Sequence, residues 1–286
     1  MQKIPKRKQQ ELKLRSSSNT SPSKSARIND SVDEPYPAYP RPSPEECRIV
    51  RDDLMSLHGF PQEFAKYRIQ RRKSHVESTS EENRKESVLD GLVSILLSQN
   101  TTDLNSQRAF ASLKSAFPIW EDVLAADSKC IENAIRCGGL AVTKASCIKN
   151  ILSCLLEKKG KICLEYLRDM SANEIKAELC QFKGIGPKTV ACLLMFHLQQ
   201  DDFPVDTHVF RITKAIGWVP TAADREKAYL HLNKRMPNEL KFELNCLFVT
   251  HGKLCHRCTN KGGGQQKRVS DDNRCPLSTY SMASNN

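Results

Sequence analysis

Two short segments place an amine and a carboxylate near each other in the chain. Residues 182–190 read Phe-Lys-Gly-Ile-Gly-Pro-Lys-Thr-Val and contain Lys188, and residues 203–209 read Phe-Pro-Val-Asp-Thr-His-Val and contain Asp206. An unprotonated lysine amine can attack an electrophilic carbon and form a Schiff base. A nearby carboxylate can stabilise developing positive charge or help to deprotonate the attacking group. The two segments therefore predict nucleophilic catalysis by Lys188 with Asp206 as its partner.

A turn that contains two glycines lies directly before this lysine. Gly184 and Gly186 permit a tight turn with unhindered N–H groups, and Pro187 has the fixed φ favoured at the first position of a helix. A phosphate bound here would meet the positive end of a helix. We therefore expect Gly184, Gly186 and Thr189 to contact a phosphate backbone. From this turn alone, Lys188 is explained equally well as a cation that only binds phosphate.

The elements that must position these residues are predicted to be helices. Apolar residues recur at three- and four-residue spacing through residues 88–96 and again through residues 148–155. Capping-box spacing predicts helix starts at Ser87, Ser171 and Thr221. Glycines predict helix ends at residues 138–139, 160, 217 and 252. Because no segment alternates like a strand, we expect an all-α fold.

Three blocks in a fixed order resemble the helix-hairpin-helix DNA glycosylases of the endonuclease III branch. They are Leu-Leu-Ser-Gln-Asn-Thr-Thr-Asp at residues 96–103, the turn with Lys188, and Val-Asp-Thr-His-Val at residues 205–209. The resemblance runs from about Ser87 to about Cys258. It implies that Lys188 attacks the sugar C1′ and that Asp206 is the essential carboxylate. It also implies two helical lobes with a cleft between them, and double-stranded DNA with a flipped damaged base as the partner.

The resemblance implies base-excision repair with an associated abasic-site lyase step. Oxidised pyrimidines are the usual substrates of this branch. The segments at residues 203–207 and 217–220 are also similar to plant demethylating glycosylases, so removal of 5-methylcytosine, or of a mismatched base, stays an alternative. A non-catalytic DNA-binding module is a further alternative. Such a module has no use for Asp206, which therefore favours the enzyme.

The block at residues 96–103 has two interpretations. By the resemblance, Gln99, Asn100 and Thr101 lie at the cleft, and Gln99 fills the space that a flipped nucleotide leaves. The alternative is a simple helix-capping turn, because Asn, Thr and Asp all suit that task.

The C-terminal cysteines raise the question of a metal. The endonuclease III branch commonly carries a four-iron four-sulfur cluster on four cysteines that follow a His-Gly pair. Here His251-Gly252 precedes only Cys255, Cys258 and, after sixteen intervening residues, Cys275. Three thiolates disfavour the cluster, since a cubane normally takes four. These cysteines with His256 are a candidate zinc site, and a degenerate site without metal is equally compatible.

Composition supports a polyanionic partner and a reducing compartment. The net charge is +11, and residues 1–30 hold eight Lys or Arg against two acids. Lys6-Arg7-Lys8 favours nuclear import over a basic DNA-tethering arm or a chloroplast or mitochondrial transit peptide.

Eight of the twelve cysteines lie in apolar helical patterns, which predicts reduced, buried thiols: Cys130, Cys137, Cys147, Cys154, Cys163, Cys180, Cys192 and Cys246. No apolar run reaches membrane-spanning length. We expect a monomer.

These patterns divide the chain into five segments. We expect a disordered basic tail at residues 1–45, then an N-terminal helix and a polar connection at 46–88 that join the second lobe. Residues 89–200 form the helical barrel with the hairpin, and 201–259 the C-terminal helices of the second lobe. Residues 260–286 form a flexible tail.

Overall fold

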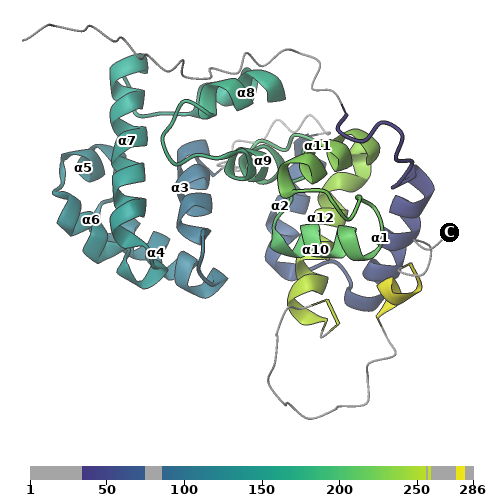
Figure 1. Cartoon of the computed structure of the whole chain (residues 1–286). Coiled ribbons are helices and arrows are strands. Elements are labelled where there is room, and N and C mark those ends of the chain that lie inside the picture. Colours follow the sequence, from purple (N-terminus) through teal and green to yellow (C-terminus); the bar gives the residue numbers. More distant parts are fainter. Residues whose placement is uncertain (1–33, 75–85, 256, 259–274, 281–286) are drawn as a thin grey trace, which may run out of the picture. The chain divides into compact units, whose positions relative to one another are not determined.

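Helices make up all the regular secondary structure in the residues that the structure describes. The computed structural model describes residues 34–74, 86–255, 257–258 and 275–280 (Figure 1). The all-α class predicted from the sequence is therefore confirmed. None of the described helices is long and apolar enough to cross a membrane.

The first hydrophobic core is built by the helices from α3 to α9. Six apolar side chains of α3, from Val88 to Leu97, are at most 2% exposed, and α3 packs against α4, α7 and α9 (Figure 1). The elements of this part are α3 (Val88–Ser98), α4 (Asp103–Ala116), α5 (Trp120–Ala125), α6 (Ser128–Ala134), η2 (Arg136–Gly138), α7 (Ala141–Lys159), η3 (Glu165–Asp169), α8 (Ala172–Leu179) and α9 (Pro187–Phe196).

The second hydrophobic core surrounds helix α12. This helix packs against α1 and α10, and the fully buried Trp218 and Phe248 meet edge to face with ring centroids 5.5 Å apart. A smaller cluster around Met195, Phe242 and Cys246 includes side chains of η1 and α2. The elements of this part are α1 (Pro44–His58), η1 (Gln62–Phe64), α2 (Ala65–Ser74), α10 (Thr207–Ala215), α11 (Arg225–Arg235), α12 (Asn238–Leu254) and η5 (Pro276–Thr279).

Residues 34–43 contact the second core, although the sequence predicted disorder through residue 45. Glu34 pairs with Arg235 at 2.6 Å, and the Tyr39 hydroxyl donates to the carbonyl of Gly217 at 2.8 Å. Ser43 caps α1 through its side chain. Residues 34–43 therefore belong to the folded part, although their composition is polar. The predicted basic import signal at residues 6–8 lies outside the described residues.

Two further segments also differ from the sequence prediction. Helix α2 occupies part of the predicted polar connection, where Arg68 donates to Glu243 at 2.6 Å and Arg71 pairs with Asp201. Within the predicted C-terminal tail, Leu277 of η5 is 4% exposed and packs in the second core. The partners of these residues are distant in sequence, so local patterns could not reveal them.

The predicted helix ends are partly correct. Ser171 forms a capping box at the start of α8, as expected. Thr221 does not cap α11, because the side chain of Asp224 accepts the first-turn N–H instead. Gly252 lies inside α12 rather than at its end. A Cβ there would lie 2.6 Å from the His208 side chain, so this glycine allows α10 and α12 to approach.

All twelve cysteines lie in described residues and carry free thiols. Cys147 and Cys246 are buried, as predicted. The prediction of burial was wrong for Cys130, Cys137 and Cys180, which are exposed. Cys137 lies in the short helix η2 and Cys180 is the C-cap of α8. Their positions at helix ends place them outside the continuous apolar faces.

A buried lysine joins the end of α3 to helix α7. Lys144 is 3% exposed, and its Nζ donates to the carbonyls of Leu97 at 2.7 Å and Gly138 at 2.9 Å. In Lys144→Met these carbonyls lose their partner, so we expect a loss of about 1–3 kcal/mol in the free energy of unfolding. Urea denaturation of both proteins measures this loss in the free energy of unfolding. The exposed Lys129→Met should change stability by less than about 0.5 kcal/mol, and equal effects of both substitutions would contradict the structural role of Lys144.

Candidate active site

A tight turn between α8 and α9 presents free backbone N–H groups. Gly184 has φ +89°, a left-handed conformation that favours glycine. Gly186 is the N-cap of α9 and offers no side-chain hydrogen bond to the first turn, and Pro187 follows at the first helical position. The N–H groups of this first turn are therefore available to an anion, and the positive end of the helix favours one. The predicted tight turn is present, and its contacts with phosphate stay a prediction.

The two glycines of the turn are predicted to differ in their tolerance of a side chain. A Cβ on Gly184 would lie 2.6 Å from Sγ of Cys147, in addition to the strain of its φ, whereas a Cβ on Gly186 meets nothing within 4 Å. We expect Gly184→Ala to cost about 1–3 kcal/mol of stability and to weaken DNA binding at least about tenfold.

Gly186→Ala serves as the matched control for this turn. Gly186 has a φ of −98°, which any residue can adopt. The Gly186→Ala variant should therefore unfold at nearly the same temperature as the unaltered protein. Thermal unfolding and fluorescence anisotropy with duplex DNA test both variants. Equal tolerance at the two positions would rule out the described turn conformation.

Lys188 and Asp206 occupy the starts of two different helices. Lys188 is the second residue of α9 and is exposed. Asp206 is the half-buried N-cap of α10, and its Oδ1 accepts the N–H of Val209 at 2.7 Å. Val205, directly before it, is 3% exposed and anchors the segment in the second core. The capping bond fixes one carboxylate oxygen of Asp206 at the helix start.

The thiol of Cys192, one turn after Lys188 on α9, lies within the electrostatic reach of both residues. Burial raises the pKa of Cys192 to about 12. The charge of Lys188 lowers this pKa, and the charges of Asp206 and Asp202 raise it. Lys188 and Asp206 each lie at the start of a helix, and their pairing in one catalytic site stays a prediction.

Gln99 is tethered to the same helix. Helix α3 ends at Ser98, and Asn100 turns the chain with φ +52°. The Gln99 amide then donates to the hydroxyl of Thr189 at 3.1 Å. Thr189 is 4% exposed, so its buried hydroxyl holds the Gln99 side chain, and its predicted contact with DNA stays a prediction. The turn also has the predicted capping role, because the side chain of Thr102 caps α4.

Asn100 and Thr101 follow Gln99 on the surface side of this turn. Asn100 is exposed and Thr101 half-buried. At the start of α4, Asp103 pairs with Lys253 near the end of α12 at 2.6 Å. The turn with Gln99 is thereby connected both to α9 and to α12.

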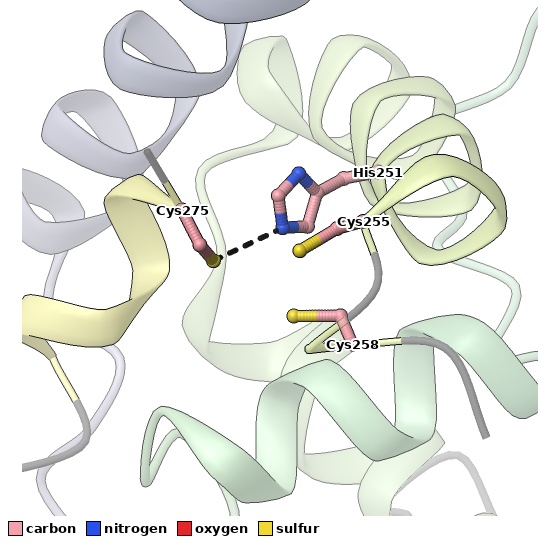
Figure 2. Close-up of side chains that lie close together, drawn as sticks. All are labelled: His251, Cys255, Cys258 and Cys275. Atoms are coloured by element: carbon pink, nitrogen blue, oxygen red, sulfur yellow. Dashed lines mark hydrogen bonds between the residues drawn. The ribbon is translucent and has the colours of Figure 1, made fainter. Parts of the chain in front are cut away.

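Four metal-binding side chains converge at the end of α12. They are His251, Cys255, Cys258 and Cys275, and their ligand atoms all lie within 4.8 Å of one another (Figure 2). The three predicted cysteines are thus brought together. The predicted fourth ligand, His256, lies outside the described residues, and His251 occupies the fourth position. The sequence could have indicated His251 as a ligand, because His251 and Cys255 are four residues apart and share one helix face.

The environment of His251 keeps its imidazole neutral near pH 7. Burial and, to a smaller extent, the neighbouring His58 together lower the pKa of His251 to about 4. His58 Nε2 lies 2.9 Å from His251 Nδ1, and Cys275 Sγ lies 3.4 Å from His251 Nε2. The ring therefore has a hydrogen-bond partner on one nitrogen and faces the thiols with the other.

Comparison with known proteins identifies the family. Residues 93–238 match the model of the HhH-GPD superfamily of base excision DNA repair proteins. The chain belongs to this superfamily and is one of its DNA glycosylases, which confirms the resemblance drawn from the three sequence blocks.

Individual relatives agree with this assignment. The Arabidopsis thaliana protein named "Putative DNA glycosylase At3g47830" is 60% identical over 255 residues, covering 85% of this chain and 87% of that protein. The Arabidopsis "DNA glycosylase/AP lyase ROS1" is 32% identical over 168 residues, which cover 50% of this chain but 12% of that protein. A solved endonuclease III structure from a non-covalent DNA complex superimposes with a TM-score of 0.60 at 20% identity, covering 84% of this chain and 95% of that one. This last likeness shows the fold.

Proposed function

We propose that this DNA glycosylase is bifunctional: it removes oxidised pyrimidines and then cuts the abasic site through a Schiff base on Lys188. The observation that carries the proposal is the position of the two residues: Lys188 is the second residue of α9, directly after the turn with free N–H groups, and Asp206 is the N-cap of α10. The similarity to a relative named as a glycosylase and AP lyase supports the lyase step.

The first step is displacement of the damaged base. The neutral amine of Lys188 attacks C1′ and the N-glycosidic bond breaks, so the base leaves with the bonding electron pair and takes up a proton. The transition state resembles an oxocarbenium ion. The ionised carboxylate of Asp206 stabilises this positive charge. Because one oxygen of Asp206 already accepts the Val209 N–H, the other is free to face the sugar.

The second step cuts the strand. Opening of the sugar ring converts the Lys188 adduct into an imine, which acts as an electron sink. A base removes a proton from C2′, and the 3′ phosphate leaves with its bonding electrons. Water then hydrolyses the imine and restores the lysine. The free N–H groups around Gly184 and Gly186 hold the phosphate backbone during these steps.

Gln99 supports extraction of the target nucleotide. Unstacking a base costs a few kcal/mol and is easiest for a damaged or mispaired one. The bond to Thr189 holds the Gln99 side chain close to the start of the helix that carries Lys188. We infer that Gln99 enters the duplex and occupies the vacated space.

A second candidate substrate is 5-methylcytosine. The segments 203–207 and 217–220, which are similar to plant demethylating glycosylases, motivate it. The test is incubation with duplexes that carry thymine glycol, uracil, 5-methylcytosine or an abasic site, with and without borohydride. We expect excision of thymine glycol with covalent trapping. Preferential excision of 5-methylcytosine would favour the second candidate, and inertness toward every lesion would contradict the catalytic proposal.

A further inference from the structure

The four ligands at the end of α12 differ from the set that a four-iron four-sulfur cluster requires. A cubane binds four thiolates, each on a different iron, so its ligand atoms lie on the outside of a core of eight atoms. Here three thiols and an imidazole have their ligand atoms within 4.8 Å of one another. This spacing leaves no room for such a core. The residues do not fit the cluster that is common in the endonuclease III branch.

We propose that His251, Cys255, Cys258 and Cys275 bind a single Zn²⁺ in a structural site. Zinc takes Cys and His ligands in a tetrahedron, with bonds of about 2.3 Å to sulfur and about 2.0–2.1 Å to nitrogen. The edges of that tetrahedron are about 3.8 Å between two sulfurs and about 3.5 Å between sulfur and nitrogen. The distance from Cys275 Sγ to His251 Nε2 is 3.4 Å, and Figure 2 shows all four side chains pointing at one point.

The surroundings of His251 complete the site. A histidine that binds a metal through Nε2 carries its proton on Nδ1 and usually donates it to a fixed partner. Nδ1 of His251 lies 2.9 Å from Nε2 of His58 on α1, which accepts that proton. His58 thereby orients the ligand, and the zinc site includes a residue almost two hundred positions earlier in the chain.

The zinc site joins the end of the chain to the helix that starts at Asp206. Cys275 is the N-cap of η5, and Tyr280, directly after η5, donates to Asp53 of α1 at 2.7 Å. Arg211 of α10 donates to the carbonyl of Cys258. The ion therefore links η5 and α12 and, through the Cys258 carbonyl, supports α10. This inference is independent of the lyase step, because it concerns metal binding and stability.

Metal analysis of the full chain, purified without oxygen, tests the proposal. We expect about one zinc per chain and no absorption band near 400 nm. Replacement by Co²⁺ should give the visible bands of a tetrahedral site and charge-transfer bands from thiolate. Iron with acid-labile sulfide, or a folded chain that binds neither zinc nor cobalt, would overturn the proposal.

Variants separate the ligands from the other cysteines. Cys258→Ser should lose the zinc, whereas Cys130→Ser, at an exposed position remote from the ligand set, should keep it. If Cys258→Ser does not fold, His58→Ala provides a milder test that leaves every ligand in place. It should weaken zinc affinity about 10- to 100-fold in competition with a chelator. Unchanged affinity in His58→Ala and retained zinc in Cys258→Ser would each refute the assigned roles.

Discussion

Lys188→Gln is expected to abolish borohydride trapping and strand cleavage on duplexes with thymine glycol or an abasic site. Glutamine keeps hydrogen-bonding capacity at the start of α9 but cannot form an imine. We expect the lyase rate to fall at least about 10³-fold, as for removal of other covalent nucleophiles. Denaturing gel analysis after borohydride treatment measures both trapping and cleavage.

Lys183→Gln is the matched control for this experiment. Lys183 is an exposed lysine in the same turn, so its replacement also removes one positive charge that faces DNA. It should weaken DNA binding modestly and make that binding less sensitive to salt than in the wild type. Trapping should continue. Efficient trapping by Lys188→Gln, or its loss in Lys183→Gln alone, would move the nucleophile elsewhere.

Asp206→Asn is expected to lower the rate of base excision by about 10²–10⁴-fold with little loss of stability. Asparagine caps a helix about as well as aspartate, so the bond from the Val209 N–H can persist. The substitution therefore removes the charge and keeps the cap. Single-turnover excision of thymine glycol and thermal unfolding measure the two effects separately.

Asp224→Asn makes the same change at an equivalent cap. Asp224 accepts the Lys227 N–H at 2.7 Å, the same length as the bond to Asp206. We expect this variant to excise the lesion at the normal rate. A similar loss of excision in both variants would mean that capping, and not the charge of Asp206, matters for the reaction.

The local setting of the proposed catalytic residues was predictable, because it depends on neighbours in sequence. The glycines before Lys188 predict the turn, and the position of Asp206 before an apolar helical stretch predicts a helix start. The link between Gln99 and Thr189 was not predictable. It joins residues ninety positions apart, and its polar partners leave no periodic signal.

The metal site was likewise predictable only in the part whose residues are close in sequence. Cys255 and Cys258 form a recognisable local pair, and Cys275 was counted as a third ligand. The four-residue spacing of His251 and Cys255 was a usable local signal, but the contact of His58 of α1 with His251 joins residues far apart in the chain. The order of residues 34–43 likewise depends on partners such as Arg235, which lie far along the chain.

Mapping the covalent adduct in the unaltered protein tests the central claim most directly. After trapping on abasic-site DNA and nuclease treatment, trypsin digestion and mass spectrometry would locate the attached sugar. A modified Lys188 blocks cleavage at that residue, so the account predicts one adduct-bearing peptide from Gly184 to Arg211, in which Lys188 is the internal lysine. An adduct on any other lysine, or on the N-terminal amine, would contradict the account.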